Sequence, residues 1–281
     1  TVTAGATMTL VVRTKPIWTW TDTHKRVHRC RATLTGPGKD RVKPRSKSIR
    51  TGKVARWRIR LPITAEDGLW TSRVTCTHAG ASSDLFNVRS ATRRARVTDQ
   101  QLRHRGGEGW SWAARVYGAS AYDLAGTTIT ANLRDAAGRF ITDSAATVRI
   151  QRRTSGWVGG TITVEGREVP ASVHVTAVGR PAVSSRVRLR AFDARPVVVT
   201  SEYSDPSVTV RGSIRNDASA AAEFDYVFVT VFDATGRLVA AERDYAFAQL
   251  PARGEVGVDV DAGRLNGAVP VHAEIFTPLS D

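Results

Sequence analysis

Short segments in which apolar and polar residues alternate recur along the whole chain, separated by residues that favour turns. In the first third they run from Thr7 to Val12, Val27 to Leu34, Val54 to Leu61 and Leu69 to Thr77. Side chains of a strand point alternately to its two faces, so such a segment buries one face and exposes the other. No long segment follows the 3.6-residue period of a helix. The pattern predicts an all-β chain built from β-sandwiches.

The strand predicted at residues 54–61 carries an arginine at every second position, alternating with apolar residues. An earlier run of basic residues has the same period, but Pro44 makes that run an edge strand or a loop. Alternating positions share a face of a strand, so we expect the two runs to form a basic contact surface. The candidate binding residues are Arg41, Lys43, Arg45, Lys47, Arg56, Arg58 and Arg60.

The chain is long enough for two or three domains. Turn residues and shifts in composition divide it into a basic module at 1–90, a linker at 91–107, and further modules at 108–195 and 196–281. The linker holds five arginines among small and polar residues and ends with Gly106 and Gly107. Because it has little apolar surface to bury, we expect it to be mobile or bound to a partner.

The last two modules contain two copies of one pattern. At a shift of 98 residues Asp135 aligns with Asp233 and Gly138 aligns with Gly236. In each copy a predicted strand is followed by the sequence Asp-Ala-x-Gly and then by a second predicted strand. Aspartate can accept the backbone N–H two residues on, and glycine supplies a positive φ, so each copy predicts a tight hairpin. One carboxylate per turn supplies too few oxygens to favour a calcium site.

The first module contains Cys30, Trp57 and the run from Asp67 to Cys76, in which Asp-Gly-x-Trp leads into the second cysteine strand. In these features it resembles an immunoglobulin-like domain. Val74 stands where that family has a tyrosine, two residues before the second cysteine. The resemblance implies an Ig-like sandwich over the first module.

The last module contains a strand from Val210 to Asn216, the run from Val229 to Asp233, and a Leu-Pro-x-x-Gly step from Leu250 to Gly254. It resembles the FxLYD family, small Ig-like sandwiches of exported bacterial proteins, most clearly over residues 200–281. Apolar residues replace the letters of the family name, with Phe232 at the tyrosine position. Residues 108–195 form a divergent copy. The resemblance implies structural and interaction roles without catalytic residues, and the chain as a whole is predicted to be three tandem immunoglobulin-like β-sandwich domains.

Positive charge is concentrated near the N-terminus. Residues 1–105 have a net charge of +17, the remainder has −2, and all six lysines lie between Lys15 and Lys53. This asymmetry indicates an electrostatic role for the first module, or simply a basic composition without a dedicated partner. The chain begins with Thr1, which suits a processed product, and no run of twenty apolar residues is present.

The two cysteines, Cys30 and Cys76, favour one disulfide and therefore an oxidising, extracellular or cell-surface location. His28 and His78 each lie two residues from a cysteine, so zinc binding and free thiols remain as alternatives. Structural zinc ligands are usually supplied by knuckles or helices rather than by positions within strands. No cofactor or metal is expected.

Two Trp-x-Trp pairs, Trp18 with Trp20 and Trp110 with Trp112, each place both rings on one strand face. They fill a core, or they form an exposed platform for a sugar ring or a protein anchor. Trp18 and Trp20 are therefore included as candidate binding residues. Motifs for hydrolytic nucleophiles, metalloproteases and phosphate-binding loops are absent from the sequence.

These features predict a secreted, non-enzymatic adaptor or adhesion subunit that docks an acidic protein or an anionic cell-envelope polymer, either by itself or as part of a larger exported assembly such as a toxin or surface particle. A carbohydrate-binding module that uses the tryptophan pairs is one alternative. A nucleic-acid-binding protein is another, because arginine suits phosphate. The disulfide and the lack of a nucleic-acid-binding motif argue against the latter.

Overall fold

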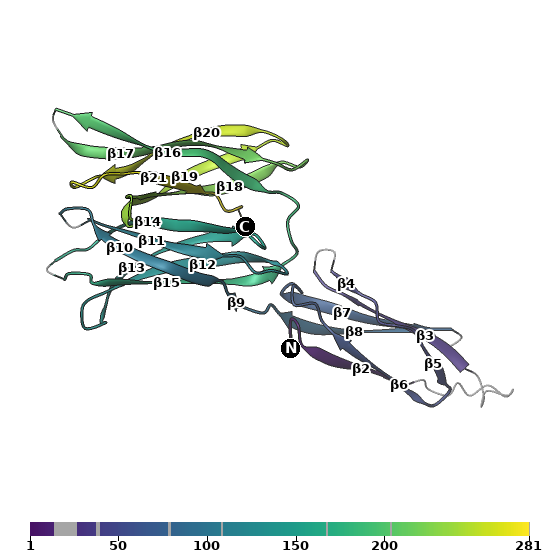
Figure 1. Cartoon of the computed structure of the whole chain (residues 1–281). Helices are drawn as coiled ribbons and strands as arrows, with labels where there is room; N and C mark the ends of the chain where they lie inside the picture. The colour runs from purple at the N-terminus through teal and green to yellow at the C-terminus, as the bar shows by residue number, and fades with distance from the viewer. Residues whose placement is uncertain are drawn as a thin grey trace, which may run out of the picture. The chain divides into compact units, whose positions relative to one another are not determined.

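The computed structural model of the chain describes residues 1–13, 27–37, 40–77, 80–107, 109–166, 168–202 and 204–280. All regular secondary structure in these ranges is β-strand (Figure 1), as the alternating pattern predicts. Across the described ranges we find no helix long and apolar enough to cross a membrane. The strands form two compact units, Thr1–Thr92 and Arg93–Asp281.

The first unit is a sandwich of one large and one small sheet. The large sheet has the strand order β1-β8-β7-β3-β4, with β5 also paired to β3, and the small sheet pairs β2 with β6. The bounds are β1 Val2–Thr3, β2 Thr7–Arg13, β3 Val27–Thr35, β4 Arg41–Val42, β5 Lys47–Arg50, β6 Val54–Arg60, β7 Gly68–Cys76 and β8 Gly80–Arg89. The core between the sheets contains Leu34, Trp57 and Trp70, all at most 2% exposed.

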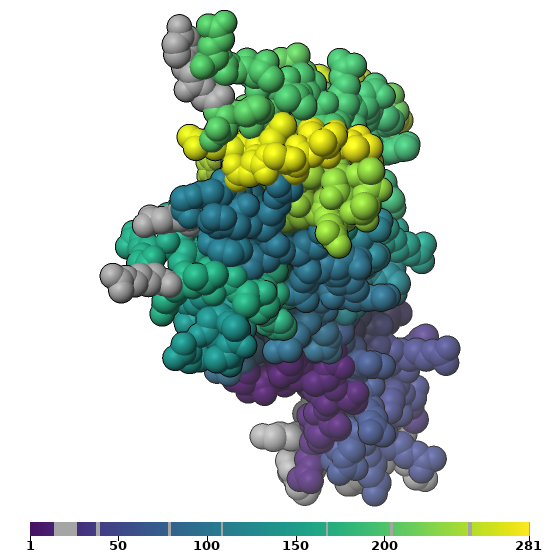
Figure 2. Space-filling model, turned by 60° about the vertical axis from the view of Figure 1, so that its left-hand side comes forward, coloured from purple at the N-terminus to yellow at the C-terminus, as the bar shows by residue number. Residues whose placement is uncertain are grey.

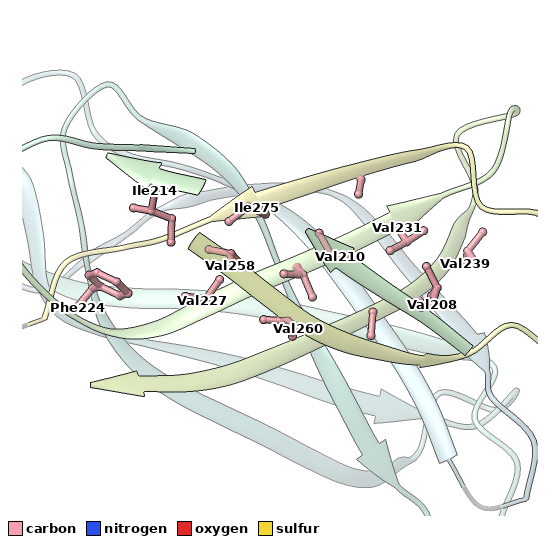
Figure 3. Close-up of a cluster of buried hydrophobic side chains, with 14 of the residues drawn as sticks. Val208, Val210, Ile214, Phe224, Val227, Val231, Val239, Val258, Val260 and Ile275 are labelled. Carbon is pink, nitrogen blue, oxygen red and sulfur yellow. The ribbon is translucent and has the colours of Figure 1, made fainter. Parts of the chain in front are cut away.

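The second unit contains two pairs of sheets with one strand order. In the first pair, β10-β11-β14 faces β13-β12-β15-β9 across a shared core. In the second pair, β16-β17-β20 faces β19-β18-β21 across the valine-rich core of Figure 3. The bounds are β9 Arg93–Arg94, β10 Arg96–His104, β11 Gly109–Tyr117, β12 Asp123–Arg134, β13 Phe140–Ile150, β14 Ser155–Thr163, β15 Ser172–Ala182, β16 Leu189–Ser201, β17 Ser204–Asn216, β18 Ala222–Phe232, β19 Leu238–Leu250, β20 Glu255–Arg264 and β21 His272–Phe276.

The internal repeat predicted from the sequence is present in the structure. Strands β10 to β15 follow the same order as β16 to β21, and the two Asp-Ala-x-Gly turns join equivalent strands. In each turn the aspartate Oδ1 accepts the backbone N–H two residues on, from Ala137 at 2.9 Å and from Thr235 at 2.8 Å. Gly138 and Gly236 have φ values of 76° and 79°. The turn chemistry predicted for both copies is confirmed.

The two sheet pairs of the second unit pack against each other through β14, β18 and β19 (Figure 1). Strand β18 is buried on both faces, because Val229 enters its own core whereas Phe228 packs into the core of the other pair. Between the pairs, Trp157 contacts Phe232 with ring centroids 4.8 Å apart. Gly159 in β14 lets this strand lie close to β19, because a Cβ on Gly159 would be only 2.9 Å from the Cβ of Ala241.

The prediction of a mobile linker at 91–107 is wrong. Residues 93–104 contribute β9 and β10 to two different sheets of the second unit. Arg103 donates to the carbonyls of Leu238 and Leu265 at 3.2 and 3.0 Å, and burial lowers the pKa of its guanidinium while Asp233 opposes the shift. Arg103 therefore has partners more than 100 residues away in the same chain, which composition alone could not show.

Candidate functional site

The outer face of the small sheet in the first unit carries the three arginines of β6. Trp57 and Ile59 point into the core and are 2% and 3% exposed, whereas Arg56, Arg58 and Arg60 are exposed on the opposite face. Period-two alternation therefore divides this strand as the sequence predicts. The core-directed tryptophan is held in place by a hydrogen bond from its Nε1 to the carbonyl of Arg45, at 2.9 Å.

Strand β2 completes this face and adds a residue that the sequence reasoning missed. In the β2–β6 register Thr7 lies opposite Arg60, Thr9 opposite Arg58, Val11 opposite Arg56, and Arg13 opposite Val54. Met8, Leu10 and Val12 point to the core, so Arg13 lies on the outer face with the other three arginines. The alternation of β2 itself was the signal that could have identified it. The N-terminal strands, coloured purple, lie at the surface of the first unit in Figure 2.

The earlier basic run does not share one face, which corrects the prediction. Arg41 lies opposite Thr35 and points outward from the large sheet, whereas Lys47 lies opposite the core residue Cys30. Residues 43–46 leave the ladder around Pro44, so the register slips by one residue between β4 and β5. A slip of one residue moves later side chains to the other face of the sheet.

The slip brings the second half of the basic run to β6. Lys47 Nζ donates to the backbone carbonyl of Arg56, across the open edge of the sandwich. The Trp57–Arg45 hydrogen bond lies next to this contact. Arg45 and Lys47 therefore adjoin the start of β6, Lys43 is exposed in the intervening loop, and Arg41 lies on the opposite outer face.

The arginines on the outer face of the small sheet are not neutralised by neighbouring acids. Within the described ranges, none of Arg13, Arg56, Arg58 and Arg60 takes part in an ion pair. Three acidic residues of this unit accept backbone N–H groups instead: Asp40 from Glu66 at 3.2 Å, Asp84 from Leu85 at 2.9 Å, and Asp67 from Ser90. The guanidinium groups therefore remain available to an external anion, apart from one bond from Arg60 Nε to the Gly5 carbonyl at 3.3 Å.

The disulfide between Cys30 and Cys76 is present. The two residues lie directly opposite each other on β3 and β7, which are neighbours in one sheet. The backbone N–H of Thr77 donates to the Arg29 carbonyl at 3.1 Å, so the cysteines form a non-hydrogen-bonded pair, the antiparallel pair type whose side chains lie closest.

His28 is buried beside this disulfide and has local partners. Its Nδ1 lies 2.7 Å from the Thr77 carbonyl oxygen and its Nε2 lies 3.0 Å from the Thr51 hydroxyl. His78 lies outside the described residues. Among the residues that the structure describes, no cluster of three or more histidine, cysteine or acidic side chains could hold a metal ion.

Only one of the two tryptophan pairs lies within the described residues. Trp18 and Trp20 lie outside the described residues. Trp112 is 3% exposed in the core of the second unit, and Trp110 packs against the same core from the same strand face. The ring of Trp110 lies 4.9 Å from that of His104, at a shallow depression also lined by Glu168. For this pair the core-filling alternative is confirmed at Trp112, while Trp110 is half-buried.

The aspartates of the two repeat turns are also structural. Two hydrogen bonds from Arg139 lower the pKa of Asp135 below its ordinary value. The bond from the backbone N–H of Arg139 has the larger effect, and the bond from its side chain has the smaller one. The Thr235 hydroxyl and the Arg237 backbone N–H lower the pKa of Asp233 in the same way. Each carboxylate is thus engaged by its own turn.

No protein-family model matches the chain, and no curated protein matches it. The FxLYD resemblance therefore stays a prediction. Solved structures show weak likeness. A tetra-tandem repeat in the extending region of a large adhesion protein is 13% identical, with 99% of this chain and 71% of that chain covered and a TM-score of 0.28.

Two further structures are similar at the same level. The FN1–FN3 domains of chicken CNTN1 are 12% identical, with 92% of this chain and 91% of that chain covered and a TM-score of 0.23. A tandem CBM22 domain from a Paenibacillus barcinonensis protein is 9% identical, with 69% and 86% covered and a TM-score of 0.12. At these TM-scores none of the functions in those names transfers to the present chain.

Proposed function

We propose that this chain is a secreted, non-enzymatic adaptor or adhesion subunit whose first unit docks an acidic protein or an anionic cell-envelope polymer. One observation carries the proposal: four arginines share the outer face of the β2–β6 sheet without an acidic residue on that face among the described positions. Charge of one sign on an exposed surface attracts an oppositely charged partner and raises the rate of encounter.

The distribution of charge between the two units supports this division of roles. Residues 1–92 contain 18 basic and 5 acidic residues, a net charge of +13, whereas residues 93–281 contain 23 basic and 21 acidic residues, a net charge of +2. The second unit, with its two sheet pairs packed together, would present the basic unit and offer a second docking surface. The disulfide supports an oxidising, extracellular location.

Charge reversal on β6 tests the proposal in the full chain. The triple variant Arg56→Glu, Arg58→Glu and Arg60→Glu changes only exposed positions, so we expect the fold to be retained. Binding to isolated bacterial cell envelopes and to secreted bacterial proteins should become weaker, and its dependence on salt concentration should flatten. Unchanged affinity and unchanged salt dependence would contradict the adaptor function.

Trp110 favours carbohydrate binding as a second candidate function. Its half-buried ring borders a depression that also presents His104 and Glu168, so an apolar face and polar groups lie together as sugar recognition requires. Titration of the full chain with cell-wall glycans, followed by tryptophan fluorescence, tests this candidate. A response that disappears in Trp110→Phe supports it, and an absence of response in the parent chain contradicts it.

A further inference from the structure

The four arginines of the small sheet form a ladder with one guanidinium in each row across the strands. The rows are Thr7 with Arg60, Thr9 with Arg58, Val11 with Arg56, and Val54 with Arg13. The arginine comes from β6 in three rows and from β2 in the fourth, so two separate segments contribute to one line of charge. We call Arg60, Arg58, Arg56 and Arg13 the arginine ladder.

Strand geometry fixes the spacing of the ladder. Residues two positions apart on a strand are about 6.7 Å apart along it, so four consecutive rows span about 20 Å. The threonine hydroxyls of the first two rows lie on the same face as the arginines and can add hydrogen bonds to bound oxyanions. The face thus offers evenly repeated sites for anionic groups, arranged along one direction.

The residues between the guanidinium groups indicate which class of partner fits. A protein interface usually draws its affinity from aromatic or apolar anchors that fill pockets. Here the apolar side chains on the face are Val11, at 54% exposure, and the half-buried Val54 in the last row, and neither is aromatic. A single-stranded nucleic acid is usually held by bases stacked on aromatic rings, and no aromatic residue lies on this face of β2 and β6.

A repeating anion needs neither a pocket nor a stacking ring. Arginine binds carboxylate, sulfate and phosphate groups through two parallel N–H donors, which favours it over lysine at such sites. We propose that the arginine ladder is a binding track for a linear anionic polysaccharide that lies along β6. This proposal rests on the adaptor function proposed above and narrows its partner to one chemical class.

The opposite outer face of the same unit provides a matched control. It carries Arg29, Arg31 and Arg73, also exposed, but on two strands and among the exposed apolar residues Val27 and Leu69. The ladder variant is Arg56→Gln, Arg58→Gln, Arg60→Gln, and the control variant is Arg29→Gln, Arg31→Gln, Arg73→Gln. Both remove three positive charges from the first unit, so a difference between them reports geometry rather than net charge.

Affinity is measured for the full chain and both variants on dextran sulfate and polygalacturonate, with an oligothymidylate and an oligoglutamate peptide as rival ligands. The ladder variant should bind the polysaccharides about tenfold more weakly, and the control variant should stay within about twofold. Affinity of the parent chain should rise with oligosaccharide length until the oligomer is about 20 Å long, where the fourth row is filled. In the single variant Arg13→Gln, the longest oligosaccharide should bind no more tightly than the one that fills three rows, because the fourth row then lacks its guanidinium group.

Equal losses in the two triple variants would overturn the track, because only net charge would then matter. Tighter binding of oligothymidylate or oligoglutamate than of the polysaccharides would also overturn it. These results differ from a failure of the adaptor function, which the glutamate-reversal variant tests on cell envelopes. If that variant loses envelope binding while both glutamine variants are weakened equally, the adaptor function stands and the polysaccharide track is wrong.

Discussion

The guanidinium group of Arg105 occupies the position that a side chain on Gly263 would need. An ideal Cβ on Gly263 would lie 1.2 Å from Arg105 Nη2. Arg105 follows β10 in the first sheet pair of the second unit, and Gly263 lies in β20 of the second pair. The same guanidinium forms an ion pair with Glu242, at 3.3 Å, and donates a hydrogen bond to the hydroxyl of Thr161. The Thr161 hydroxyl in turn donates to the Glu242 carboxylate at 2.7 Å. One arginine therefore joins the two sheet pairs, and the glycine makes room for it.

Gly263→Ala should destabilise the second unit by about 2–4 kcal/mol. Gly263 has a φ of 101°, which costs about 1–2 kcal/mol for a residue with a Cβ, and the displaced Arg105 would lose its partly buried partners Thr161 and Glu242. Gly257→Ala in the same strand is the control, because a Cβ there meets no atom within 4 Å. Its effect should stay within about 0.5 kcal/mol. Denaturant unfolding measures the stability of both variants. Equal stabilities would contradict the role of Arg105 in joining the two sheet pairs.

Gln101 provides a second connection between the sheet pairs. Its Oε1 accepts the backbone N–H of Leu238 at 2.6 Å, and its Nε2 donates to the Gly236 carbonyl at 3.2 Å. Gln101→Ala leaves the N–H of a buried residue without this partner, so unfolding free energy should fall by about 1–3 kcal/mol. Gln249→Ala removes an exposed hydrogen bond to Glu223 and should change stability by less than about 0.5 kcal/mol. Hydrogen exchange at the Leu238 amide should accelerate only in the first variant.

Local patterns were sufficient to predict the strands and the turns. Alternation identifies the core face of β6 through Trp57, and the Asp-Ala-x-Gly repeat identifies turns at Asp135 and Asp233. These features depend on residues close together in the sequence, where side-chain direction and turn chemistry leave few choices. The all-β class follows from their repetition along the chain.

Contacts between distant segments were not predictable in the same way. The arginines of residues 93–105 suggest a solvated linker, yet Arg103 is clamped by carbonyl groups more than 100 residues away in sequence. The run Val227 to Phe232 did contain a usable signal, because a nearly continuous apolar run, interrupted here only by Thr230, is typical of a strand buried on both faces. The face on which Lys47 lies depends on a one-residue slip in register near Pro44. The prediction from period-two alternation required a continuous strand without such a slip. The candidate site was therefore predicted on β6 and missed at Arg13.

Asp233→Asn separates the charge of the turn aspartate from its hydrogen bonds. The folded chain lowers the pKa of Asp233, so its ionised form contributes stability above the unfolded pKa of about 3.9, and this contribution is lost as pH falls through the folded pKa. Asparagine retains an Oδ1 acceptor for Thr235 and Arg237. The variant should therefore be less stable than the parent at neutral pH, and the difference between them should shrink as pH falls below about 4, where the parent loses the carboxylate charge as well. An NMR titration in which the Asp233 carboxyl shows an ordinary pKa would contradict this.

Removal of the disulfide should destabilise the first unit and leave the second unchanged. Cys30 and Cys76 are 46 positions apart in sequence, and closing a loop of that size is worth about 4 kcal/mol in the chain-entropy model. Both residues lie in the core with Trp57 and Trp70, so tryptophan fluorescence and calorimetry can follow this unit. In the variant Cys30→Ala, Cys76→Ala the unfolding transition of the first unit should move to lower temperature, as it should in the parent chain under reducing conditions. The transition of the second unit, which contains no cysteine, is the internal control, and a fall in both would show that the two units do not unfold independently.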